Sequence, residues 1–238
     1  MAEIIHIARH GLHEQVANRL RTMLVEGRIA PGAKLNEREL AALLQVSRTP
    51  LREAIKLLGA EGLVDLLPNR GAVAVQLSES DVEHSFEVLA ALEGQSGELA
   101  AARIDSAELA ELHALHYEML ACFSRRDLSG YYRLNAQIHV AINAAAKNPV
   151  LTETYRRINA RVQSMRFRTN QDGAKWTLAV KEHERMVEAL SARDGAAMHA
   201  LLVEHLLHKR DTVLALMRAG QVYPSAAHAS GASVHPRT

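Results

Sequence analysis

Cysteine and aromatic residues are both scarce in this sequence. Cys122 is the single cysteine of the 238 residues, so no disulfide can form within the chain. Aromatic residues account for 4% of the composition, whereas alanine and leucine are frequent, and this balance favours helices over sheets. The N-terminus lacks the long apolar stretch of a signal peptide, and no apolar run approaches the length of a membrane span. We therefore expect a soluble, cytoplasmic protein without a membrane segment.

An excess of one charge sign is also missing. The chain carries 28 lysine and arginine residues against 27 aspartate and glutamate residues, for a formal net charge of +1. Such a small charge gives no general attraction to nucleic acid, so a DNA-binding surface must come from a local cluster of basic side chains. The length leaves room for one large domain or two modest ones, and two domains are the better expectation.

Helical periodicity and turn residues predict three short helices in the first part of the chain. The first covers residues 12–27 and ends at a glycine. The second begins at Asn36, with Glu39 three residues later in the arrangement of a capping box. After a tight turn, Ser47 or Thr49 caps the third helix. A tight turn between two such helices is typical of a helix-turn-helix unit.

Two short strands follow these helices. They cover residues 63–66 and 72–75 and are joined by a loop that contains Pro68 and Gly71, as turns favour. Three helices followed by a hairpin is the order of a winged helix-turn-helix domain, which we place at residues 1–76.

The rest of the chain changes to longer amphipathic helices. Breaks rich in glycine, proline, asparagine and aspartate separate roughly six of them. Ser78 and Asp81 form another capping signature, which sets the start of an all-α helical bundle at residues 77–218. Residues 219–238 are small, polar and aperiodic, which predicts a disordered tail. The expected fold class is thus mainly α, with a small β-hairpin wing in the N-terminal domain.

Basic residues recur every four positions along the third predicted helix. Arg48, Arg52 and Lys56 therefore share one helix face. The face that packs on the domain core is formed by Leu51, Ala54, Ile55 and Leu58. Arginine can donate two hydrogen bonds to one guanine, so we expect Arg48 and Arg52 to read bases in the major groove. Lys56 is better suited to a phosphate contact.

Two further arginines extend this basic set. Arg38 lies near the start of the second helix, where helix-terminal amides can help to hold a phosphate. Arg70 lies at the hairpin tip and can reach the neighbouring groove or the backbone. A single exposed arginine is more often only a solvated charge, but the whole set in this context predicts an interface for double-stranded DNA.

The N-terminal part closely resembles a known family. The run IAPGAKLNERELAALLQVSRTPLREAIKLLGAEGLVDLLPNRGAVAV is similar, without gaps, to the N-terminal signature of GntR-type regulators. The resemblance implies DNA contacts at Arg38, Ser47, Arg48, Thr49, Arg52 and the wing glycine Gly71. It also implies a homodimer that binds a palindromic operator.

Four side chains of the helical half form a candidate metal site. Asn135 and His139 are four residues apart on one predicted helix, so both lie on the same face. His183 and His205 fall on the apolar stripes of two later helices and should point inward. A single inward histidine is more often a hydrogen-bonded core residue than a ligand, and that alternative stays open for each of them.

This half resembles the FadR C-terminal domain, the all-helical effector module of the GntR subfamily. The segments NAQIH, EHERMVEAL and EHL carry the resemblance, which implies a metal held by an aspartate and three histidines, and a small carboxylic acid as effector. Two positions depart from the family pattern: Asn135 replaces the usual aspartate, and Leu89 stands where an arginine often precedes Glu93. An amide oxygen is a weaker ligand than a carboxylate and leaves the site more positive.

The donor set also indicates which metal and which effector to expect. One oxygen and three imidazole nitrogens suit zinc first and nickel second, and they suit calcium or magnesium poorly. We therefore expect a divalent metal with open positions that attract an anionic effector. Arg161 flanks an apolar stripe of the same half and is a candidate to hold the acid, although a plain surface position fits its spacing equally well.

Two other functions use the same residues. A metallosensor responds to the cation itself rather than to an organic acid. A metal-dependent hydrolase uses the cation to activate water, but the sequence has no His-Glu-x-x-His motif. Glu182, beside His183, projects about 100° away from it on a helix and is poorly placed as a general base. We therefore expect a transcription regulator rather than an enzyme.

Overall fold

The computed structural model describes residues 11–168 and 173–221 of the chain. The chain divides into two compact units, Met1–Gln76 and Leu77–Thr238, and each is treated by itself. Most of the predicted tail, from residue 222 onward, lies outside the described residues. In the described part, no helix combines the length and the apolar character that a membrane crossing requires.

The first unit is a winged helix-turn-helix, as predicted. Its elements in chain order are α1 (Leu12–Val25), α2 (Glu37–Leu44), α3 (Arg48–Ala60), β1 (Val64–Leu67) and β2 (Gly71–Ala74). The tight turn between α2 and α3 is made by a residue with a left-handed backbone, Gln45, at φ 54°. Leu20, Leu51 and Leu58 are fully buried at the centre of this unit, where α1 packs against α3.

Local hydrogen bonds explain where these helices begin. The Asn36 side chain accepts hydrogen bonds from the backbone N–H groups of Arg38 and Glu39, which confirms the predicted cap of α2. Of the two residues proposed to cap α3, Ser47 occupies the N-cap position and Thr49 lies in the first turn. The Ser47 side chain makes no capping hydrogen bond, so its hydroxyl is available to another partner.

The hairpin that forms the wing differs slightly from its predicted bounds. β1 and β2 pair antiparallel with Val64 opposite Ala74 and Leu67 opposite Gly71, so each strand is shifted by one residue from the sequence-based expectation. β1 starts one residue later than predicted, and the backbone N–H of Leu63 bonds to Leu58 O at the end of α3, whereas β2 starts and ends one residue earlier. Gly71 has φ 86°, a conformation that residues with a Cβ rarely adopt, so the backbone itself requires this glycine.

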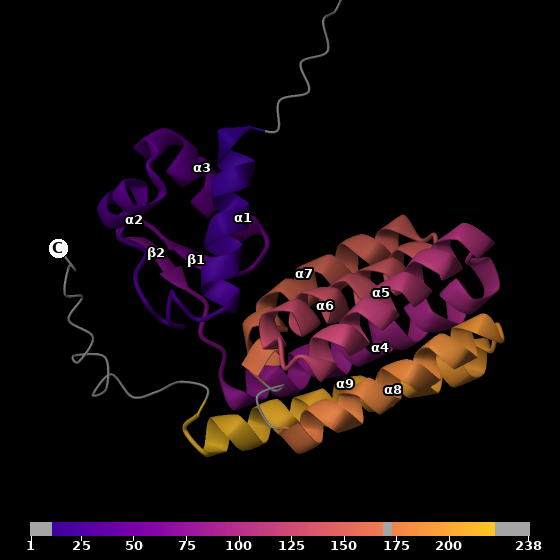
Figure 1. The fold of residues 1–238 in the computed structure, drawn as a ribbon. Coiled ribbons are helices and arrows are strands. Elements are labelled where there is room, and N and C mark those ends of the chain that lie inside the picture. Colours follow the sequence, from indigo (N-terminus) through magenta and orange to yellow (C-terminus); the bar gives the residue numbers. More distant parts are fainter. Residues whose placement is uncertain (1–10, 169–172, 222–238) are drawn as a thin grey trace, which may run out of the picture. The chain divides into compact units, whose positions relative to one another are not determined.

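The second unit is all-helical in its described residues and confirms the mainly α fold class. Its elements are α4 (Glu79–Arg103), α5 (Ser106–Ser124), α6 (Leu128–Ala145), α7 (Pro149–Arg168), α8 (Gly173–Ser191) and α9 (Gly195–Arg218) (Figure 1). Ser78 and Asp81 form a reciprocal capping box at the start of α4, as predicted. A large apolar core links α4, α5, α6, α8 and α9.

The central helix α4 and the last helix α9 run side by side at close range. A Cβ added at Gly94 would lie 2.8 Å from Val203 Cγ2, and one added at Gly97 would collide with Leu202 Cδ1. Small residues at these two positions let the helix axes approach, which brings the inward faces of α4 and α9 together. Both helices contribute residues to the site described next.

Candidate functional site

The exposed face of α3 carries the basic residues that the sequence singled out. Arg48, Arg52 and Lys56 are all exposed. The opposite face, which packs on the core as predicted, is formed by Leu51, Ala54, Ile55 and Leu58. The structure therefore separates a face that can contact DNA from a face that stabilises the unit.

Two of these basic side chains already have acidic neighbours. Arg52 Nε lies 2.7 Å from Glu37 Oε2 at the start of α2, and Lys56 Nζ lies 2.8 Å from Glu53 Oε1 on the same helix. Exposed pairs of this kind contribute little to stability, so each side chain can readily exchange its partner for a base edge or a phosphate. The Lys56 ammonium, through its hydrogen bond, keeps the pKa of the Glu53 carboxyl below its usual value.

The remaining proposed DNA contacts lie at element ends of the same unit. Ser47 and Thr49 are exposed at the start of α3, where first-turn N–H groups lack helical partners. Arg38 is exposed at the start of α2, and both Arg70 and Gly71 are exposed at the hairpin tip. All eight predicted positions are thus accessible on the first unit.

The second unit brings three of the proposed metal ligands together. His139 on α6, His183 on α8 and His205 on α9 each place a ring nitrogen within 4.8 Å of the others. Their ring centroids are 5.1–5.3 Å apart, and the three side chains are almost completely buried. Asn135 is buried one turn before His139 on α6, on the same helix face.

These side chains present polar atoms without protein partners. His139 Nε2, His205 Nε2, both ring nitrogens of His183 and Asn135 Oδ1 are buried and make no hydrogen bond. Burial is the main cause that holds the pKa values of His183 and His205 well below the usual range, so both rings are neutral at pH 7. Neutral imidazoles with unused lone pairs are ligands for zinc or nickel, so the donor set fits a divalent cation.

Two buried glutamates orient the rings. Glu93 Oε2 lies 2.5 Å from His139 Nδ1, and Glu182 Oε2 lies 2.5 Å from His205 Nδ1. A carboxylate can only accept hydrogen bonds, so in each histidine the Nδ1–H group donates a hydrogen bond to the carboxylate. The Nε2 atom of each ring keeps its lone pair. Burial raises the pKa of Glu93, but His139 and Arg166 outweigh it and lower the value to about 2, so this carboxylate is ionised.

Glu93 and Glu182 were not identified as site residues from the sequence. Glu182 does point away from its neighbour His183, as its helical position requires, but it bonds to His205 and His208 on α9 instead. Its position along the helix could have identified Glu182 as an inward-facing residue. It lies four residues before the buried Met186 and so occupies the inner face of α8. A charged residue on an apolar stripe indicates a specific partner.

The predicted effector residue Arg161 is not brought to this cluster. Its side chain is exposed on α7. Arg166 of the same helix is buried, with Nη1 3.2 Å from Glu93 Oε1 and 2.7 Å from Asn159 Oδ1. The two residues lie five positions apart and so project to different sides of the helix.

Replacing Glu182 with glutamine keeps the side-chain shape but removes the negative charge that fixes His205. We expect zinc affinity to fall by about 10–100-fold, the usual cost of losing a carboxylate behind a metal-binding histidine. Competition with a fluorescent zinc chelator measures this change. Glu184→Gln, at an exposed position on the same helix, is the matched control and should bind zinc as wild type does. Equal zinc affinity in both variants would contradict the orienting role of Glu182.

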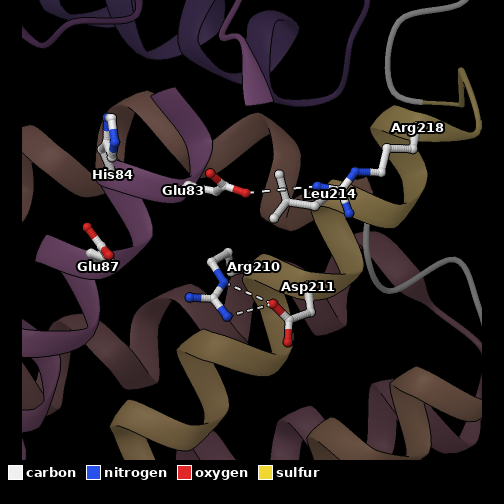
Figure 2. A pocket seen from close by; sticks show the side chains of 7 residues that line it. All are labelled: Glu83, His84, Glu87, Arg210, Asp211, Leu214 and Arg218. Carbon is white, nitrogen blue, oxygen red and sulfur yellow. Dashed lines mark hydrogen bonds and ion pairs between the residues drawn. The ribbon is translucent and has the colours of Figure 1, made fainter. Parts of the chain in front are cut away.

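A hollow lies between the first part of α4 and the last part of α9 (Figure 2). Glu83, His84, Glu87, Arg210, Asp211, Leu214 and Arg218 line it. Its arginines already face acids: Arg218 Nε is 2.8 Å from Glu79 Oε2, and Arg210 Nη2 is 2.8 Å from Asp211 Oδ1. The histidine cluster, in contrast, presents buried nitrogen atoms without partners, so the cluster is the better candidate for a ligand site.

Comparison with known proteins assigns each half of the chain to a family model. Residues 12–73 match the model described as bacterial regulatory proteins, gntR family, and residues 84–208 match the FCD domain. The FCD match alone covers more than half of the chain and contains the cluster of three histidines.

Individual relatives agree with these matches. The HTH-type transcriptional repressor RspR of Escherichia coli K12 is 25% identical over 202 residues, which are 85% of this chain and 89% of that protein. The Nta operon transcriptional regulator of Aminobacter aminovorans is 30% identical over 202 residues, covering 82% of this chain and 91% of that protein. The solved structure of E. coli McbR/YncC shares the fold with a TM-score of 0.78 and 22% identity, covering 88% of this chain and all of that one.

Proposed function

The chain belongs to the GntR family of bacterial transcriptional regulators and carries an FCD effector domain, and we propose that a small carboxylic acid bound at the histidine cluster controls its binding to an operator. The family and the relatives are transcriptional regulators, not enzymes. This removes the hydrolase alternative and leaves two forms of regulation, by an organic acid or by the metal itself.

The observation that carries the proposal is the set of unpartnered nitrogen atoms at the cluster. Leaving several buried polar atoms without hydrogen bonds is costly, and one cation facing all three rings would give a partner to one nitrogen of each. We assign the site to zinc, with nickel second, and the ligands to Asn135, His139, His183 and His205. When bound, the cation supplies open coordination positions for an acidic group.

The DNA-binding half of the proposal rests on residues 1–76. Arg48 and Arg52 read base edges of a double-stranded, palindromic operator from the major groove, and Lys56 contacts phosphate. The sugar-phosphate backbone of the operator DNA is contacted by Arg38, Ser47, Thr49, Arg70 and Gly71. A regulator of this kind acts on the bacterial chromosome, which places it in the cytoplasm.

We expect a homodimer whose interface lies mainly in residues 77–218. One winged domain buries too little DNA surface for a specific complex, and a palindromic site matches two-fold protein symmetry. A fragment that begins at Ser78 should therefore remain dimeric at micromolar concentration, as measured by light scattering. A monomeric fragment derived from a dimeric full-length chain would contradict this assignment of the interface.

The experiment that tests the proposed function combines two titrations with one DNA assay. Zinc and then a panel of small carboxylates are added to metal-free protein in a calorimeter, and the same additions are made in gel shifts on the DNA flanking the protein's own gene. We expect zinc uptake first, acid binding second, and a change in operator affinity only with the acid. Loss of operator binding on zinc alone favours a metallosensor. If neither zinc nor any carboxylate binds and operator affinity does not change, the proposal is wrong.

A further inference from the structure

One acidic side chain lies against an arginine of α3 that is proposed to read a base. Glu37, in the first turn of α2, accepts a hydrogen bond from Arg52, with 2.7 Å between Nε and Oε2. The two residues are 15 positions apart and belong to the two helices that flank the tight turn. Both side chains reach the surface, with 31% of Glu37 and 59% of Arg52 exposed. The contact therefore lies beside the face of α3 that can meet DNA.

This pair differs in its hydrogen bonds from another arginine–glutamate pair of the same unit. Arg21 donates to both carboxylate oxygens of Glu61, from Nε and from Nη2, and so ties α1 to the end of α3. Arg52 donates to Glu37 from Nε alone. Within the part of the chain that the structure describes, its terminal nitrogens make no hydrogen bond to the protein. Arg52 thus keeps its outer donors for another molecule.

The donors that remain on Arg52 match a guanine. A guanidinium is planar and carries its N–H groups in a fixed fork, one at Nε and the others at the terminal nitrogens. While Glu37 holds Nε–H, the end of the fork formed by Nη1 and Nη2 can donate to guanine O6 and N7 together. An exchange of Glu37 for a base edge is possible, but this geometry does not require it. Arg52 can therefore read a base and keep its acidic partner.

The Glu37 carboxylate also acts on the alternative partner of Arg52, which is the DNA backbone. Non-specific binding to DNA is essentially electrostatic and depends on uncompensated lysine and arginine charges. A carboxylate beside the guanidinium offsets its charge and repels nearby phosphates, whereas hydrogen bonds to the uncharged guanine edge are retained. Glu37 therefore weakens binding to random DNA more than binding to the operator.

We propose that Glu37 is a positioning residue that sets the sequence specificity of Arg52. It holds the guanidinium in the orientation that reads one guanine in each half-site, and its charge disfavours binding to the backbone alone. The inference rests on the proposed function, because it needs Arg52 to contact a base. A pair that only joined α2 to α3 would affect the stability of the unit and leave the base preference as it is.

The test measures the affinity of the full-length protein for its operator, for each single-base variant of that operator and for random DNA of equal length. The operator is first selected from random-sequence DNA by the wild-type protein. We expect Glu37→Ala to lower the ratio of operator to random affinity by about 10-fold or more, since a good bidentate contact supplies a discrimination of this size. The loss should fall on one guanine position per half-site, the same position that Arg52→Ala relaxes.

Three further variants separate the positioning of Arg52 from general charge and from folding. Glu53→Ala removes an exposed acid of α3 that pairs with Lys56 rather than with Arg52, and should keep the base preference. Glu37→Gln keeps an acceptor for Nε–H and should retain more of the preference than Glu37→Ala does. Adding Glu37→Ala to Arg52→Ala should remove no further preference. Thermal unfolding of all variants should stay close to that of the wild type, because the pair is exposed.

Each outcome decides a different claim. If Arg52→Ala relaxes one guanine position and Glu37→Ala does not, or if Glu37→Ala lowers the preference equally in the absence of Arg52, the inference is wrong and base reading by α3 stands. If Glu53→Ala lowers the preference as much as Glu37→Ala does, the effect is one of general charge and the inference is again wrong. If the wild type selects no sequence, or Arg52→Ala relaxes no position, the DNA-reading part of the proposed function fails, and the inference with it.

Discussion

Alanine in place of His183 or His205 should remove most of the bound zinc. Each substitution deletes one of three imidazole ligands, so we expect the affinity loss to exceed the roughly 10–100-fold typical of a residue that only orients a ligand. The measurement is elemental analysis of wild type and variants after dialysis, read as metal per chain. Because both rings are fully buried, each variant also leaves a cavity, and its fold should be checked by circular dichroism.

The chain offers a matched control for this experiment. His199 lies on α9 with 44% of its side chain exposed and pairs with Glu98 rather than with the cluster. His199→Ala should therefore keep the metal content of the wild type. If the wild type itself takes up no zinc and still responds to a carboxylic acid, the three histidines bind the acid directly and the metal assignment is wrong.

Alanine in place of Arg52 should abolish sequence-specific DNA binding without unfolding the protein. The lost base contact corresponds to about 1–3 kcal/mol, and in a dimer each half-site contributes it once. The fold is retained because the pair between Arg52 and Glu37 is exposed and contributes little. Gel shifts with operator DNA and with random DNA of equal length measure the sequence-specific part of the affinity. Arg48→Ala should behave similarly.

Two further variants distinguish the recognition of specific bases from non-specific electrostatic binding to DNA. Lys56→Ala should weaken operator and random DNA alike and reduce the salt slope by about one unit, as expected for a lost phosphate contact. Arg19→Ala removes an exposed arginine of α1 and should change neither. Unchanged operator affinity in Arg52→Ala would show that α3 presents a different residue to the bases.

Much of the fold was predictable because its signals are local. The spacing of apolar residues located the helices, and Asn36 and Ser78 marked two of the helix starts by side-chain bonds that reach only two or three residues along the chain. The later start of β1 goes with a backbone bond from Leu63 to the end of α3, which joins the hairpin to a different element. Bounds that depend on such contacts are not encoded in a single stretch of sequence.

For the site too, the sequence predicted which face of a helix a residue occupies, but not which helices lie against each other. Periodicity correctly assigned His183 and His205 to inner faces, but it says nothing about which helices face each other. The pairing of Glu93 with His139 spans 46 residues, and that of Glu182 with His205 spans 23, so neither could be found from spacing. Spacing also could not tell that Arg161 is exposed while Arg166, five positions later, is buried, because only packing decides which of the two faces inward.

The histidine cluster also has a mechanical consequence. Its histidines and the charged side chains linked to them by hydrogen bonds come from five helices of the second unit, α4, α6, α7, α8 and α9. A ligand at this point therefore ties five helices together by their side chains. We expect such a ligand to stabilise these helices together, because the hydrogen-bonded chain from Arg166 through Glu93 to His139 has its counterpart from His208 through Glu182 to His205.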